Sequence, residues 1–163
     1  MKTLLILRHA KSSWKNPGLD DHDRPLNKRG KRDAPRMGKL LRKKDLVPDL
    51  IISSTARRAR KTAKVVAKAS HYDGEIRLTR SLYHAGPAEY LEVLRDLPDD
   101  YQRVMVVGHN PGMEELLELL TDIPEFMPTA ALAQVALPID RWAELDDTVP
   151  GELRKLWRPR ELA

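Results

Sequence analysis

The sequence predicts an α/β fold, a three-layer α/β/α sandwich with a mostly parallel central sheet, and three observations support it. Short apolar runs alternate with segments of helical apolar spacing, which is typical of βαβ units. Polar side chains follow several of the apolar runs directly, as they do at the carboxyl edge of an open sheet. The chain has 163 residues and no evident linker, so we expect a single domain over residues 1–163.

The expected strands are the apolar runs at residues 3–7, 50–53, 75–78, 103–107, 131–137 and 152–157. The first and fourth are continuous, as in strands buried on both faces of a sheet. The last two complete the sheet, in a direction that the pattern does not determine.

The first expected helix begins after Asn27, a good N-cap residue, and continues to about Lys44. Pro35 conflicts with an unbroken helix, so we expect a kink or a late start there. Its inward-facing residues are Ala34, Met37 and Leu41.

Three more helices follow from start signals and spacing. Pro87 and Pro111 stand at first-turn positions, with Gly86 and Asn110 as their N-caps. Two apolar faces recur at helical spacing: Ala59, Ala63, Val66 and Ala69 on one helix, and Met113, Leu116, Leu117 and Leu120 on another.

Composition indicates a soluble, cytoplasmic protein. Charged residues make up 33% of the chain and the mean hydropathy is −0.52. The apolar runs are too short to span a bilayer, so no membrane association is expected. The chain has no cysteine, which excludes disulfides, thiol catalysis and thiolate metal sites.

The net charge is +5, and the excess is concentrated in residues 28–44, where Asp33 is the only acid. This basic segment could attract an acidic protein or nucleic acid. A solvated helix face is the better interpretation, and nucleic acid is an unlikely partner, because no aromatic residues for base stacking interleave the charges.

Chemically active side chains follow three of the expected strands. Arg8 and His9 follow the first, Arg58 comes shortly after the second, and His109 and Asn110 follow the fourth. Because the carboxyl ends of parallel strands share one edge of a sheet, these groups converge there. Two guanidinium groups, two imidazoles and a helix start favour an oxyanion such as phosphate.

Phosphoryl transfer depends mainly on positioning and charge stabilisation. Arginine forks bind the phosphoryl oxygens, and a neutral imidazole can attack phosphorus and hold it covalently. The sequence contains no P-loop, and enough protein cations are present for the reaction to need neither metal nor cofactor.

Four motifs occur in the order typical of one known family: Leu7-Arg8-His9-Ala10-Lys11-Ser12-Ser13-Trp14, Arg24-Pro25-Leu26-Asn27-x-x-Gly30, Ser54-x-x-x-Arg58-Ala59-x-x-Thr62-Ala63 and Gly108-His109-Asn110-Pro111. The first resembles the Arg-His-Gly signature of the histidine phosphatase superfamily, which has the phosphoglycerate mutase-like fold. With the short chain and Pro128-Thr129-Ala130-Ala131, the set is most similar to the SixA-type phosphohistidine phosphatases. The similarity covers nearly the whole chain.

The resemblance implies roles for individual residues. His9 would be the nucleophile that becomes phosphorylated, and Arg8, Arg58 and His109 would surround the phosphoryl group. Arg58 matches the motif because it precedes Ala59, four residues before Thr62.

For several other residues the sequence predicts a role less precisely. Ser12 and Asn110 would add donors at the pocket rim, while Arg24 is either a substrate contact or an ordinary surface arginine. Arg57 is a helix-surface residue or an outer contact of the site, and we interpret His22 and His71 as surface residues because no motif surrounds them.

The glutamate that acts as general acid in many members of the superfamily has no counterpart in residues 81–86. His84 or Glu89 could donate the proton, although His84 is as readily a loop residue without a catalytic task. An alkoxide leaving group depends on an acid by roughly 10²–10⁴-fold. A phosphoramidate needs less help, so the missing glutamate favours phosphohistidine as the substrate.

The expected function is therefore a metal-independent phosphatase that acts through a phosphohistidine intermediate and removes phosphate from phosphohistidine in a protein partner. The first alternative is a phosphatase of small phosphate esters or nucleotides. The second is an inactive phosphate-binding or protein-interaction module whose basic segment docks an acidic partner.

Overall fold

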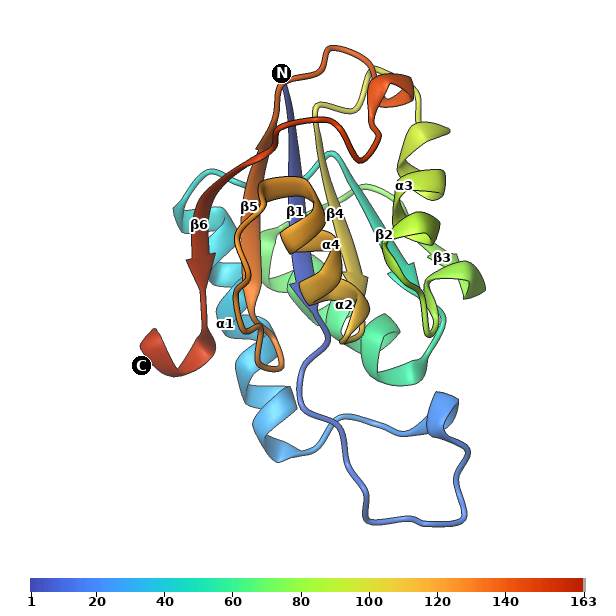
Figure 1. The fold of residues 1–163 in the computed structure, drawn as a ribbon. Helices are drawn as coiled ribbons and strands as arrows, with labels where there is room; N and C mark the ends of the chain where they lie inside the picture. The colour runs from blue at the N-terminus through green and yellow to red at the C-terminus, as the bar shows by residue number, and fades with distance from the viewer. Residues whose placement is uncertain (163) are drawn as a thin grey trace.

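A computed structural model describes residues 1–162, and its centre is a six-stranded sheet (Figure 1). The strands are β1 (Lys2–Arg8), β2 (Leu50–Ser54), β3 (Ile76–Thr79), β4 (Arg103–Gly108), β5 (Leu132–Leu137) and β6 (Glu152–Trp157). Their order is β3-β2-β4-β1-β5-β6. The first four are parallel, whereas β5 is antiparallel to both of its neighbours. The sheet is mostly parallel, as expected.

Four helices cover the two faces of the sheet. In Figure 1, α1 (Lys28–Lys43) and α2 (Arg57–Ser70) lie behind it, while α3 (Pro87–Arg95) and α4 (Gly112–Thr121) lie in front. This is the predicted three-layer α/β/α sandwich. Within residues 1–162, no helix combines the length and apolar character that crossing a membrane requires.

Each face of the sheet has its own apolar core, because successive strand residues point to opposite faces. Leu4 and Ile6 of β1 belong to a core that includes residues of α3 and α4. Leu5 and Leu7 belong to a second core, with residues of α1 and α2. β1 is therefore buried on both sides, which explains its continuous apolar run.

The start of α1 at Lys28 is as predicted after Asn27, and Pro35 does not delay it. The Asn27 side chain accepts a hydrogen bond from the Gly30 amide at 2.9 Å, which caps the first turn. The helix then continues through Pro35 to Lys43, so the expectation of a late start is wrong. Proline removes one backbone donor, and burial of the inward-facing residues outweighs that loss. These residues are Ala34, Met37 and Leu41.

The start of α4 lies one residue later than predicted. Pro111 is the N-cap residue and Gly112 begins the helix, so Asn110 is not the N-cap. The Asn110 amide nitrogen donates instead to the Met127 carbonyl at 3.0 Å. Its side chain thus joins the end of β4 to the loop before β5, which local sequence does not reveal. For α3, the predicted Gly86 cap and Pro87 start are confirmed.

Candidate active site

Arg8, His9, Arg58 and His109 meet at the carboxyl edge of the sheet. β1 and β4 are neighbours, with Arg8 opposite Gly108. The His9 amide donates to the Gly108 carbonyl at 3.0 Å, and the centroids of the His9 and His109 rings are 5.0 Å apart. The chain leaves β1 and β4 toward opposite faces of the sheet, and ligands of open α/β folds bind in the resulting crevice.

His9 is held as a neutral imidazole. Its Nδ1 lies 2.7 Å from the carbonyl oxygen of Ala10, which can only accept, so Nδ1 carries the proton. Burial is the main cause that lowers the pKa of His9 to about 3; the bond to Ala10 opposes it, and the nearby His109, Arg58 and Arg8 act in the same direction as burial. Nε2 therefore keeps its lone pair at neutral pH. This is the form that can act as a nucleophile.

His109 is also neutral. Burial lowers its pKa to about 3, and the adjacent Arg58 acts in the same direction. Its Nε2 lies 2.9 Å from the Ser54 hydroxyl at the end of β2. Its Nδ1 is buried without a hydrogen-bond partner in the described chain, as are Nε of Arg8 and Nε of Arg58. Buried polar groups are normally paired, so three unpaired nitrogens in one place indicate an anion site.

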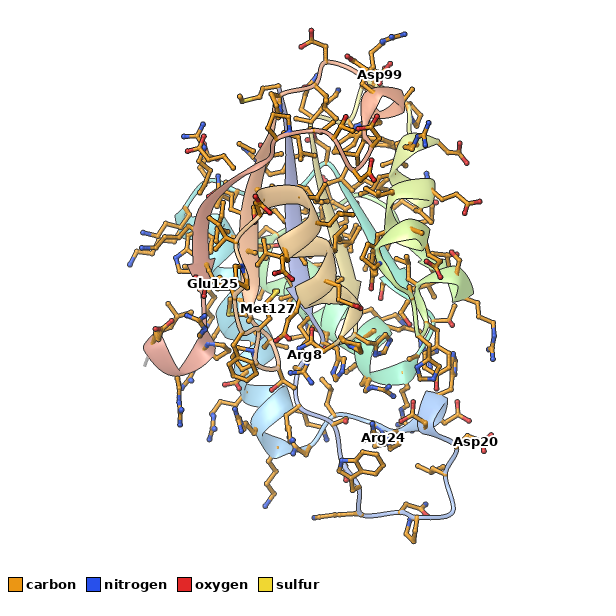
Figure 2. All side chains as sticks on the ribbon, viewed as in Figure 1. Arg8, Asp20, Arg24, Asp99, Glu125 and Met127 are labelled. Atoms are coloured by element: carbon orange, nitrogen blue, oxygen red, sulfur yellow. The ribbon has the colours of Figure 1, made fainter. Side chains whose placement is uncertain are left out.

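Arg8 is oriented by the loop between α4 and β5. Its Nη1 donates to the Met127 carbonyl at 3.1 Å, and the Met127 amide donates to Glu114 at 2.7 Å. Burial lowers the pKa of Arg8, while the negative charge of Glu114 raises it. Figure 2 shows Arg8 at the end of β1 close to Met127, with Arg24 on the loop below.

Asp21 is the residue of the site that sequence reasoning missed. Arg58 donates to its backbone carbonyl at 2.7 Å and to its carboxylate at 2.9 Å. The Tyr83 hydroxyl donates to the same carboxylate at 2.6 Å, and Arg24 does so at 3.1 Å. Burial alone would raise the pKa of Asp21, but the hydrogen bonds from Tyr83 and Arg58 hold it well below its usual range. No motif marks Asp21 among the neighbouring aspartates.

Arg24 is 7% exposed, so its interpretation as an ordinary surface arginine is wrong. Its Nη1 donates to the Ser12 hydroxyl at 2.8 Å, and its guanidinium lies 3.5 Å from the centroid of the Trp14 ring. A backbone bridge also pairs Ser12 with Leu26. Ser12 and Arg24 therefore close the long loop after β1 and hold it near the site.

The rim of the site is aromatic. Tyr83 lies 5.6 Å from His109 and 3.9 Å from His84, between ring centroids. His22 contacts the edge of Tyr83 at 4.9 Å and lies 2.8 Å from the Thr55 hydroxyl. The interpretation of His22 as a plain surface residue is therefore wrong, since it is half-buried at this rim.

The structure does not bring every candidate together. Glu89 is half-buried in the first turn of α3, and in residues 1–162 no hydrogen bond or ion pair joins it to the residues above. Arg57 and His71 are exposed, as expected for surface residues. No group of three His, Cys, Asp or Glu residues in the described chain is arranged to hold a metal ion.

The edge of an open sheet that presents two neutral imidazoles and two arginines is the arrangement of an enzyme that handles a phosphoryl group. The sequence profile of the histidine phosphatase superfamily (branch 1) matches residues 4–119. The chain therefore belongs to the histidine phosphatase superfamily.

Individual relatives agree with this assignment. An uncharacterized protein of Mycobacterium tuberculosis is 32% identical over 151 residues, which cover 86% of this chain and 92% of that protein. A candidate phosphohistidine phosphatase, SixA from Agrobacterium tumefaciens, is 32% identical with a TM-score of 0.83, over 97% of this chain and 98% of that one.

A SixA protein histidine phosphatase in complex with tungstate has a TM-score of 0.84 at 21% identity, over 99% of each chain, and shows the shared fold. The chain is a phosphatase of the SixA-type branch.

Proposed function

We propose that the chain is a metal-independent phosphohistidine phosphatase, which transfers the phosphoryl group of a protein phosphohistidine to His9 and then to water. One observation carries this proposal. The bond from Nδ1 of His9 to Ala10 leaves Nε2 unprotonated, and Arg8, Arg58 and His109 surround that ring.

In the first step, Nε2 of His9 attacks phosphorus as the P–N bond of the substrate breaks. Arg8, Arg58 and His109 donate to the phosphoryl oxygens, whose charge must be stabilised in the transition state. The substrate imidazole leaves as a neutral ring once its other nitrogen has taken up a proton from the solvent. In the second step, water attacks phosphorus, the His9–phosphorus bond breaks, and inorganic phosphate leaves. Ser12 and Asn110 are proposed as further donors at the rim, and Arg24 as a substrate contact.

The state of the two carboxylic acids Asp21 and Glu89 supports phosphohistidine over an ester. The hydrogen bonds from Tyr83 and Arg58 hold the pKa of Asp21 low, so its carboxylate stays ionised and cannot donate a proton. Glu89 has no bond to the site residues in the described chain. An alkoxide leaving group would need an acid supplied by the protein, whereas a ring nitrogen of phosphohistidine is protonated readily by the solvent.

Metal independence is supported by the charge that the protein itself supplies. Hydrogen bonds from the two guanidinium groups and from the imidazole of His109 stabilise the phosphoryl oxygens, as a metal ion does in other phosphoryl-transfer enzymes. Most of these donors are buried, where electrostatic interactions are stronger than in water.

A small phosphate ester is the second candidate substrate. The contact of His84 with Tyr83, whose ring centroids are 3.9 Å apart, favours it, because an imidazole there could protonate an alkoxide. In this second proposal, His84 is the proton donor and Tyr83 positions it.

A comparison of substrates tests the proposed function. The wild type and His9→Ala would be assayed on a histidine-phosphorylated protein and on a panel of phosphate esters, each with and without chelator. We expect selective loss of phosphohistidine, unaffected by chelator and abolished in His9→Ala, with an unchanged circular dichroism spectrum. Near-normal activity of His9→Ala would refute the covalent mechanism. Preference for an ester would favour the second candidate, and inactivity on every substrate would favour a binding module.

A further inference from the structure

Four cations form a stripe on the exposed side of α2, consisting of Arg57, Arg60, Lys61 and Lys64. Their spacing of three and four residues places them on one face of the helix, over about 10 Å of its length. They line a shallow pocket of about 150 Å³ to which no other residue contributes. We call this set the α2 stripe.

The charges of the α2 stripe are not compensated within the described chain. No acidic residue occurs in α2, and none of the four cations forms an ion pair in residues 1–162. By contrast, Arg29, Arg32 and Arg36 of α1 lie 3.6, 4.0 and 3.5 Å from the carboxylate of Asp33. The basic segment that the sequence singled out is thus partly neutralised, whereas the α2 stripe is not.

The α2 stripe also weakens the helix that carries it. Cations in the first turn oppose the helix dipole, and like charges four residues apart repel each other. Arg57 and Lys61 lie four residues apart and repel each other, and Lys64 adds positive charge to the same face of the helix. Residues that destabilise their own helix and form no compensating contact are typical of a functional surface.

The position of the α2 stripe relates it to the active site. Arg57 directly precedes Arg58, whose side chain lies in the site. The opposite face of α2, with Ala59, Ala63 and Val66, is buried against the sheet. A protein that presents a phosphohistidine to His9 is therefore brought next to the exposed face of α2.

We propose that the α2 stripe docks an acidic surface of the histidine-phosphorylated protein substrate. This inference rests on the proposed function and adds the chemistry of the partner. Unpaired cations beside a site attract an acidic surface over several ångströms and raise the association rate, mostly at low salt. Small substrates that occupy only the phosphoryl site do not contact the stripe and gain little from it.

Two peptides of equal length test the proposal, each with one phosphohistidine. One carries four glutamates at helical spacing beside the phosphohistidine, and the other carries glutamines at those positions. Inorganic phosphoramidate serves as the small substrate. The variant Arg57→Gln/Lys61→Gln/Lys64→Gln removes three cations of the stripe. Lys31→Gln/Lys39→Gln/Lys43→Gln removes three exposed cations of α1 and is the matched control.

For the wild type we expect kcat/KM to be about tenfold higher on the glutamate peptide at low salt. The preference should vanish at about 1 M salt, where the Debye length is about 3 Å. It should also vanish in the α2 variant and persist in the α1 control, with phosphoramidate hydrolysis at a given salt concentration equal in both variants and the wild type. A preference that survives in the α2 variant, or that both variants lose equally, would overturn the proposal.

Binding of the unphosphorylated peptides, followed by fluorescence anisotropy, separates docking from catalysis. If no phosphohistidine is hydrolysed but the glutamate peptide binds through the α2 stripe, the proposed function fails and the docking surface stands. If binding does not depend on the stripe, the docking surface fails whatever the activity. Duplex DNA with the same charge as the glutamate peptide serves as a competitor. If the DNA displaces the labelled peptide at a lower concentration than the unlabelled peptide does, the stripe is a nucleic-acid surface instead.

Discussion

At His9, one contact with the backbone determines the chemistry of the ring. The carbonyl of Ala10 can accept a hydrogen bond but cannot donate one, so it selects the tautomer with the proton on Nδ1. Burial then keeps the ring neutral. His109 is neutral for the same reason. The positive charge of the site therefore comes from its arginines.

The two buried histidines make stability depend on pH. Their pKa values fall from 6.5 in the unfolded chain to about 3 in the folded one. Their contribution is thus fully present above pH 6.5 and is lost as the pH falls toward 3, because the unfolded chain then binds more protons. We expect the free energy of unfolding to fall by about 1.4 kcal/mol per pH unit for each histidine in this range.

Urea denaturation at several pH values measures this effect, with His109→Gln as the comparison. The variant should show a shallower fall between pH 6.5 and pH 5 than the wild type. Equal slopes in the two proteins would contradict the assignment of His109 as a neutral buried histidine.

Asp21 is expected to position Arg58. Asp21→Ala removes the carboxylate from a guanidinium that is 4% exposed, and an unpaired buried group costs about 1–3 kcal/mol of stability. We expect kcat/KM to fall roughly 10- to 100-fold, because Arg58 is then less well oriented.

Tyr83→Phe is the control for Asp21→Ala. It removes one hydrogen bond to the same carboxylate and leaves the contact with Arg58 in place. We expect a stability loss of about 1 kcal/mol and a smaller effect on kcat/KM. Steady-state kinetics and urea denaturation of both variants measure the difference, and a larger kinetic effect of Tyr83→Phe would refute the role of Asp21.

Among the elements, α1 depends on its first turn. Asn27→Ala removes the cap on the Gly30 amide and should lower the free energy of unfolding by about 1 kcal/mol. Gly30→Ala should cost more, because its new Cβ would overlap the carbonyl oxygen of Lys11. Urea denaturation of both variants tests this order, and a more stable Gly30→Ala variant would contradict it.

The elements also show what sequence patterns predict well. The bounds of the six strands agree with expectation to within one residue at each end, because apolar runs and turn residues are local signals. Helix starts were harder to predict. Local rules predict that Asn110 caps a helix and that Pro35 interrupts one. In the structure, Asn110 bonds to the Met127 carbonyl instead, and the packing of α1 keeps the helix continuous through Pro35.

On the scale of the whole molecule, the two apolar cores share one sheet, so the prediction of a single domain has a direct test. Trp142 is buried in the core beside α3 and α4, and Trp157 in the core beside α1 and α2. Variants that keep only one of these two tryptophans, with Trp14 also replaced by Phe, report on one core each. Within each variant, we expect fluorescence and far-ultraviolet circular dichroism to give the same urea midpoint, since a shared sheet couples the cores. Two separate midpoints within one variant would indicate two independent units.

The sequence by itself determined the α/β class, the order of the elements and the convergence of Arg8, His9, Arg58 and His109 on one sheet edge. Periodicity and strand ends are local properties of the chain, and parallel strands bring their carboxyl ends together.

Only the tertiary structure decided what those residues contact. Asp21 is 37 residues from Arg58, and Met127 is 119 residues from Arg8. Hydrogen bonds between distant loops leave no periodic signal in a sequence. The burial that keeps His9 and His109 neutral likewise depends on how the layers pack, so the chemistry of the site emerges only in the folded chain.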